Sequence, residues 1–245
     1  MIEAALFGLV FLIGGLIGAV GIGGVALAPT LNALLGTPLH EAIAIALACF
    51  VLSGMVGTVM HRRHAAVGWS SVVYLIGASA LGAFVGAMLL PLVPERLLQW
   101  SLAGLMVVAG IRAVLRSAGT SEGKQKGSLP QRERLLVVGA LAGFGSALTG
   151  TGGPLALIPL LLLMEAPVTM AIALGQVIQI PVGISASAGN FISGSLGVSK
   201  ALPIAALVAA GTFAGAIAGR RIPVRFLRML VGFSLTMSGL LYAFL

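Results

Sequence analysis

The stretch TGTGGPLALIP, residues 149–159, interrupts a long apolar run with three glycines, two threonines and two prolines. Glycine weakens a helix interior by about 1 kcal/mol and proline by about 3 kcal/mol relative to alanine, so an unbroken helix is not expected here. A second stretch of the same form, VGIGGVALAPT, lies at residues 20–30. Both stretches predict a helix break inside strongly apolar sequence.

The composition around these breaks is that of a membrane protein. The chain has 245 residues, of which 59% are hydrophobic and 8% charged, and its mean hydropathy is +1.13. Soluble domains carry about 25% charged residues. Apolar runs of about 17–25 residues, the length that crosses a bilayer as a helix, recur along the chain. The sequence therefore predicts an all-α polytopic membrane protein and lacks the alternating ten-residue strands typical of a β-barrel.

The charged residues narrow the function. The net charge is +8, but the basic residues lie in short loops between apolar runs, where they orient the spans and do not indicate a nucleic-acid partner. Buried carboxylates, which cation pathways and many proton relays need, are not expected, and neither is a metal or cofactor site. The acidic residues all fall at segment ends or in loops: Glu3, Glu41, Glu95, Glu122, Glu133 and Glu165.

The chain matches itself without a gap when it is shifted by 129 residues. The shift places the glycines at 21, 23 and 24 on those at 150, 152 and 153, and it pairs Pro38 with Pro167. We therefore expect a transmembrane repeat at 1–115, a polar cytoplasmic linker at 116–134 and a second transmembrane repeat at 135–245. Each repeat holds a glycine-broken segment (3–35, 135–164) and then three spans (42–60, 70–91, 97–115; 169–191, 199–219, 226–244).

The basic residues also predict how the repeats are oriented. If each glycine-broken segment forms a re-entrant hairpin or crosses twice, the repeats are inverted and twelve Lys and Arg residues share one side against two on the other. If the segment crosses once, the division is nine to five. The positive-inside rule favours two inverted repeats with both termini periplasmic, in a bacterial inner membrane. Such repeats are typical of secondary transporters. The first broken segment, at about 33 residues, is short for two full crossings, but the choice between re-entrant and fully spanning stays open.

The glycine breaks are the predicted substrate site. A new half-helix is expected near Val25 and at Pro154, where proline suits a first helical turn. The unpaired N–H groups and the partial positive charge at such a start bind anions without a basic side chain. Helix packing or bending is the alternative explanation of the glycines. The candidate residues at the breaks are Gly21, Gly23, Gly24, Thr149, Gly150, Thr151, Gly152 and Gly153.

Polar side chains inside the spans add four candidates. Gln176 and Gln179 are three residues apart and share a helix face. Asn190 ends the same predicted span, and Ser53 lies in the first repeat. Amides in a membrane mark either a substrate pathway or an interhelical hydrogen bond, and the sequence leaves both open. For the glycines with a four-residue spacing, packing between helices is the prediction: Gly82, Gly86, Gly211, Gly215 and Gly219.

Sequence motifs of soluble enzymes are absent, and we predict that the protein is not an enzyme. No Lys-Ser/Thr pair follows either glycine motif, and no nucleophile elbow is present. Three alternatives remain: an intramembrane enzyme acting on phosphate-bearing lipid, a cation or metal permease, and a non-transporting membrane subunit. The enzyme would need acids and bases near the breaks, and the cation permease would need carboxylates inside the spans.

The motifs GIGGVALAPTL at 21–31 and GTGGPLALIPLL at 150–161, in their repeated context, resemble the TauE/SafE family of membrane permeases, the sulfite exporters. The resemblance covers nearly the whole chain. It implies transport of sulfite or organosulfonates such as sulfoacetate across the inner membrane. We therefore expect a secondary permease for small anions that works by alternating access around the two breaks. Its expected partners are the small anionic substrate and the lipid bilayer, and a homodimer is compatible with the sequence.

Overall fold

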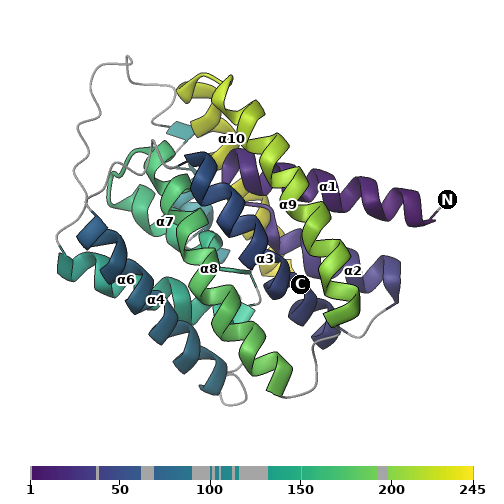
Figure 1. Ribbon diagram of the computed structural model, residues 1–245. Helices are drawn as coiled ribbons and strands as arrows, with labels where there is room; N and C mark the ends of the chain where they lie inside the picture. Colours follow the sequence, from purple (N-terminus) through teal and green to yellow (C-terminus); the bar gives the residue numbers. More distant parts are fainter. Residues whose placement is uncertain are drawn as a thin grey trace.

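The structure, a computed structural model, describes residues 2–36, 39–61, 69–89, 100, 103–104, 106–111, 114–115, 132–149, 151–192 and 198–244. All regular secondary structure in these ranges is helical, as the sequence predicts. Figure 1 shows the helices packed side by side in one bundle. The expected linker at 116–134 lies outside the described residues except where it enters the next helix, and the expected span at 97–115 is described only in part.

The helices follow the predicted spans within a few residues. The first half contains α1 (Ile2–Val20), the 3-10 helix η1 (Gly24–Ala26), α2 (Leu27–Leu35), α3 (Leu39–His61) and α4 (Trp69–Leu89). The second half contains α6 (Arg132–Thr149), α7 (Pro154–Leu163), α8 (Val168–Ile192), α9 (Val198–Arg220) and α10 (Val224–Phe244).

Both predicted helix breaks are confirmed. After α1 the chain turns at Gly21 with φ 76°, and after α6 it turns at Gly152 and Gly153 with φ 76° and 110°. Glycine alone adopts such angles at low cost, which explains its presence at these three positions. Pro154 begins α7, as predicted. The first restart is later than expected, because the 3-10 turn of η1 precedes α2 at Leu27.

Helices α3 and α8 cross closely at the centre of the bundle and run antiparallel. A Cβ added to Gly54 would lie 2.9 Å from Cβ of Gln179 and 3.0 Å from the carbonyl oxygen of Gln176. A Cβ added to Gly183 would lie 3.0 Å from the carbonyl oxygen of Leu47. Residue numbers therefore increase along α3 in the direction in which they decrease along α8.

Two further helix pairs run parallel and pack through small residues. α1 lies along α9, where the glycines at 14 and 18 face the carbonyl groups of Val208 and Thr212. α6 lies along α4, where Gly143 faces the carbonyl group of Ser79. These contacts are so close that a Cβ would collide with backbone. The predicted packing role is confirmed for Gly82, Gly86, Gly211 and Gly215, which meet backbone atoms of the same pairs, and for Gly219, which faces Ala19.

α9 also runs parallel to α3, and this arrangement determines the direction in which the chain runs between α1 and α3. At one end Lys200 Nζ lies 3.0 Å from Glu41 Oε1, and at the other end the Arg220 guanidinium donates to the carbonyl oxygen of Met60. Because α1 and α3 are both parallel to α9, the short α2 must lead the chain back. α1 and α2 therefore form a hairpin that opens toward the start of α3.

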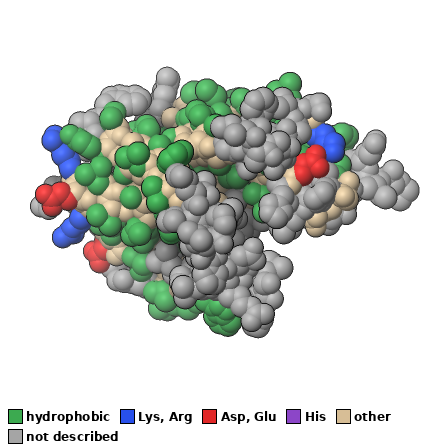
Figure 2. Space-filling model, turned by 90° about the horizontal axis from the view of Figure 1, so that it is seen from below, with side chains coloured by type: hydrophobic (Ala, Val, Ile, Leu, Met, Phe, Trp, Pro, Cys, Tyr) green, Lys and Arg blue, Asp and Glu red, His purple; other side chains and the backbone are tan. Residues whose placement is uncertain are grey.

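The surface confirms that the protein is a multi-pass membrane protein. Within the described part of the chain, three helical segments are long and apolar enough to cross a membrane: Glu41–His61, Val168–Ala188 and Lys200–Arg220. Large apolar side chains such as Leu12, Leu81 and Phe233 are more than 60% exposed. In Figure 2 most of the described side chains between the two ends of the visible face are hydrophobic, and the charged ones lie near the two ends. A water-soluble monomer rarely exposes so much contiguous apolar surface.

Candidate functional site

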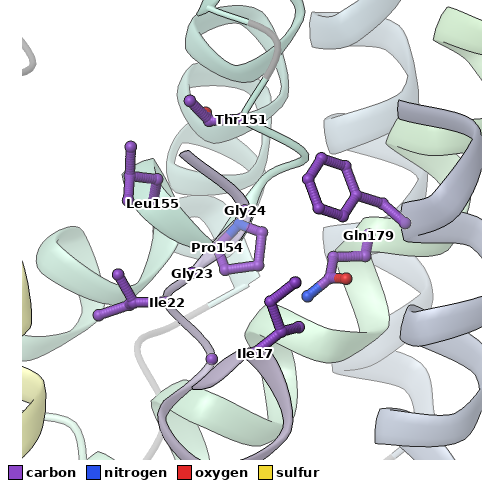
Figure 3. A pocket seen from close by; sticks show the side chains of 10 residues that line it. Ile17, Ile22, Gly23, Gly24, Thr151, Pro154, Leu155 and Gln179 are labelled. Atoms are coloured by element: carbon purple, nitrogen blue, oxygen red, sulfur yellow. The ribbon is translucent and has the colours of Figure 1, made fainter. Parts of the chain in front are cut away.

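The two glycine breaks meet at one pocket near the middle of the bundle (Figure 3). Its walls come from the end of α1, both breaks, α3, and the first turn of α7 together with α8. No lining residue is charged, and the space between them is too narrow to hold a water molecule. The lining residues are Ile17, Gly21, Ile22, Gly23, Gly24, Phe50, Thr151, Pro154, Leu155 and Gln179.

The Phe50 ring lies between the breaks. A Cβ added to Gly24 would lie 2.6 Å from the Phe50 ring and 3.2 Å from the carbonyl oxygen of Thr151. A Cβ added to Gly152 would also collide with the Phe50 ring. The glycines therefore serve two purposes, because they permit the turns and also allow the two backbones and the ring to approach.

The helices that start at the pocket have no side-chain caps, and Leu155 is the first residue of α7 with an N–H group because Pro154 has none. No side chain caps the start of α7 at Gly153 or the start of η1 at Gly23. The first N–H groups of a helix have no partner within the helix, and the helix dipole places about half a positive charge there. The pocket is too narrow for an anion as it stands, and an anion admitted by separation of the breaks would meet backbone donors from both halves of the chain.

A chain of side-chain hydrogen bonds connects α3, α8 and α1 beside this pocket. Ser53 Oγ donates to Gln179 Oε1 at 2.9 Å, and Gln179 Nε2 donates to Gln176 Oε1 at 3.3 Å. Gln176 Nε2 then donates to the carbonyl oxygen of Ile17 at 2.7 Å. Ser53, Gln176 and Gln179 are all buried, so each bond in the chain replaces a lost contact with water.

The structure separates the roles of the two glutamines. Gln176 makes an interhelical hydrogen bond, and the Ile17 carbonyl that it binds also accepts the N–H of Gly21 at 2.9 Å, so it holds the end of α1 at the break. Gln179 takes part in the same chain but also lines the pocket, where its amide points toward Ile17 and Pro154 (Figure 3). The interhelical hydrogen bond is thus present at this pair, and a place on the substrate pathway stays a prediction for Gln179.

The structure does not show how three of the candidates contribute to the site. Gly150 and the side chains of Thr149 and Asn190 lie outside the described residues. The backbone of Asn190 lies near the end of α8, eleven residues beyond Gln179, which is about 16 Å along a helix axis. Asn190 is therefore not brought to the pocket by its backbone, whereas the buried Thr151 and the other described candidates lie in or beside it.

Sequence reasoning missed Phe50, Ile17 and Ser146. The signal for Phe50 was present, because the shift of 129 residues pairs it with Gln179. Ile17 pairs in the same way with Ser146, which is fully buried in the last turns of α6, and whose Oγ has no hydrogen-bond partner among the described residues. Comparing the two repeats position by position would have found all three. In the described part of the chain, no group of three or more His, Cys, Asp or Glu side chains is placed to hold a metal ion.

Comparison with known proteins assigns the chain to a family. The family model for the sulfite exporter TauE/SafE matches residues 6–242. A protein of Bacillus subtilis (strain 168), named "Probable membrane transporter protein YdhB", is 26% identical over 242 residues, which are 96% of this chain and 97% of that protein. No solved structure matches the chain. The chain, with its broken helices meeting inside a multi-pass bundle, therefore belongs to the TauE/SafE family and is a membrane permease.

Proposed function

We propose that the protein is a secondary transporter for small anions, with sulfite or an organosulfonate such as sulfoacetate as its substrate. The observation that carries this proposal is the meeting of the two breaks. The backbone of Gly24 and that of Thr151 lie so close that a Cβ would be only 3.2 Å from the Thr151 carbonyl oxygen. Uncapped helix starts from both halves thereby face one pocket without a charged side chain. Such a pocket favours a negatively charged ligand.

The transport cycle that we propose is alternating access by two inverted repeats. Reciprocal contacts support it, because the contact of Gly54 with Gln176 becomes that of Gly183 with Leu47 when 129 is added or subtracted. Contacts exchanged in this way indicate a pseudo-two-fold relation between the halves. The equivalent helices α3 and α8 run antiparallel, which supports an axis perpendicular to them that lies in the membrane plane.

The orientation that we propose places the termini outside. Among the described basic side chains, Lys200 lies at the end of the bundle where α3 and α9 begin, and Arg220 lies at the opposite end with Met60. Arg132 shares the end of Arg220, since it sits 5.6 Å from the Tyr74 ring near the start of α4. This asymmetry supports a cytoplasmic side at the Arg220 end.

Purified protein in liposomes tests the transport proposal. We expect uptake of labelled sulfite or sulfoacetate down an imposed gradient, and we expect no uptake in protein-free liposomes. Potassium and phosphate serve as competitors in the same assay: potassium should not compete, because the pocket has no carboxylate, and phosphate tests whether the pocket distinguishes anions of similar charge by their shape. If neither sulfur anion moves while the protein is folded, the substrate assignment is wrong.

Cysteine labelling tests the orientation independently of the substrate. Cys49 is the native cysteine and is buried, so Cys49→Ala gives a clean background. On this background Lys200→Cys should react with a membrane-impermeant thiol reagent in intact cells, and Arg220→Cys should react only in inverted vesicles. The opposite pattern would reverse the proposed topology.

A further inference from the structure

Three buried hydroxyl groups outside the pocket have no hydrogen-bond partner among the described residues: that of Ser146, and two that occupy equivalent positions in the two halves. The equivalent two are Thr58 Oγ1 in α3 and Ser187 Oγ in α8, and their numbers differ by 129. A buried donor without a partner destabilises a folded protein, so each instance calls for a reason. Two instances at matching positions point to one shared reason.

Other hydroxyls in the bundle show that a partner is easy to find within a helix. Thr212 Oγ1 donates to the carbonyl oxygen of Val208 at 2.9 Å, and Thr236 Oγ1 donates to that of Gly232 at 2.8 Å. Serine and threonine in membrane helices commonly bond to the carbonyl four residues earlier in this way. Thr58 and Ser187 leave this bond unmade even though Gly54 and Gly183 supply the carbonyl groups.

The position of both hydroxyls places them along the α3–α8 interface. Thr58 follows Gly54 by one helical turn, and Gly54 is where α3 meets Gln176 and Gln179. Ser187 follows Gly183 by one turn, and Gly183 is where α8 meets Leu47. Residues four apart share a helix face, so Thr58 faces α8 and Ser187 faces α3.

Because α3 and α8 run antiparallel, the two hydroxyls lie on opposite sides of the crossing. Ser187 is at the level of about residue 44 of α3, some 14 residues from Thr58, which corresponds to roughly 20 Å along the helix axis. The amide chain from Ser53 through Gln179 lies between these levels and next to the pocket.

We propose that Thr58 and Ser187 are hydroxyl donors on the permeation pathway, one on each side of the glycine breaks, and that each binds an oxygen of the anion as it enters or leaves. The proposal rests on the proposed transport function and deepens it by placing the pathway along α3 and α8. Both hydroxyls are buried in this conformation, so each binds an anion oxygen when the α3–α8 interface opens during transport, and neither has to break an internal hydrogen bond to do so. The stability lost at each orphan hydroxyl is then explained by function.

Transport by isosteric variants in liposomes tests this inference. Thr58→Val and Ser187→Ala should each lower the sulfite flux about tenfold, the effect of one hydrogen bond. Their melting temperatures should be unchanged or raised, because no internal bond is lost. Thr58→Ser should retain the flux. Thr212→Val is the matched control, since it removes a hydroxyl that is bonded inside its helix, and it should lower the melting temperature while the flux stays within about twofold.

Cysteine accessibility decides the same question without a known substrate. In the Cys49→Ala background, Thr58→Cys and Ser187→Cys should react with a small sulfonate-bearing thiol reagent from opposite sides of the membrane, while Thr212→Cys should not react. Wild-type flux in both isosteric variants, or no labelling at either cysteine, would overturn the inference. Absence of sulfite flux in the wild-type protein together with two-sided labelling would instead reject only the proposed substrate.

Discussion

The first and second glycine breaks hold equivalent places in the chain but differ in chemistry. At the first break the neighbours of the glycines are Val20 and Ile22, whereas the equivalent residues of the second break are Thr149 and Thr151. The helices α3 and α8 beside the breaks also differ in polarity, since Phe50 of α3 corresponds to Gln179 of α8. The first half therefore lines the pocket with apolar side chains and glycines alone, whereas the second half adds the polar side chains of Thr151 and Gln179 to Pro154 and Leu155.

The backbone of the two breaks differs as well. Gly152 has φ 76°, which other residues rarely adopt, whereas its counterpart Gly23 has φ 175° and lies outside the left-handed region. The second break thus depends on glycine at a position where the first does not. Both halves thus contain a break with a positive-φ glycine, Gly21 in the first and Gly152 and Gly153 in the second, whereas the polar side chains of the pocket, Thr151 and Gln179, come from the second half.

Alanine at the two equivalent glycines gives the largest expected contrast. Gly152→Ala should reduce anion flux at least about 100-fold, because the positive φ costs about 1–2 kcal/mol and the Cβ would collide with the Phe50 ring. Gly23→Ala should stay within about fivefold of wild type, since its Cβ would be 3.1 Å from the Ile13 carbonyl oxygen and needs only a small shift. The measurement is flux per folded protein in liposomes.

Gly77→Ala in α4 serves as the control for both variants, because no atom lies within 4 Å of its added Cβ. This variant should transport like the wild type and melt at the same or a higher temperature. Equal losses for Gly152→Ala and Gly23→Ala would contradict the asymmetry between the breaks.

Replacing the pocket amide is expected to have the next largest effect. Gln179→Leu removes the polar group that faces the pocket and leaves the Ser53 hydroxyl without its 2.9 Å acceptor. We expect a flux decrease of about tenfold and a stability loss of about 1–3 kcal/mol, measured by liposome uptake and by chemical unfolding in detergent. Gln179→Glu is the sharper partner variant, because a carboxylate there should repel the anion. Uptake by Gln179→Glu at the wild-type rate would argue against an anionic substrate.

Gln176→Leu should have a smaller effect on transport than on stability. The variant loses the 2.7 Å bond to the Ile17 carbonyl, which still accepts the Gly21 N–H, so we expect about 1 kcal/mol of destabilisation. Flux should fall only a few-fold, because Gln176 does not line the pocket. If Gln176→Leu lowered the flux more than Gln179→Leu does, the assignment would be wrong, and Gln176 would be the glutamine that acts in transport.

The smallest expected effect is at the surface. Lys200 of the second half pairs with Glu41 of the first half, and the residues at the equivalent positions, Ser71 and Met170, lack charge. Lys200→Gln should cost at most about 0.5 kcal/mol in thermal unfolding, since the lysine side chain is 55% exposed. A melting temperature lowered by many degrees would contradict this, because the ion pair between α3 and α9 would then stabilise the protein more than an exposed ion pair does.

Much of the fold could be predicted from the sequence because its signals are local. Glycine and proline at 21–24 and 150–154 marked the breaks, and apolar runs marked the spans. The restart of the first broken helix was harder, because a 3-10 turn and an α-helix are close in energy over residues 24–27. The distinction between Gln176 and Gln179 could not be predicted, since it depends on where α1 ends relative to α8. The Phe50 ring between the breaks likewise follows from long-range packing.

Equilibrium binding to the purified protein is the most direct test of the claim that the two breaks form one anion site. Calorimetric titration with sulfite or sulfoacetate should show saturable binding to the wild type and to Gly77→Ala, and a large loss of affinity in Gly152→Ala despite a folded elution profile. Unchanged affinity in Gly152→Ala would contradict the account, because the anion would then bind somewhere other than between the glycine breaks.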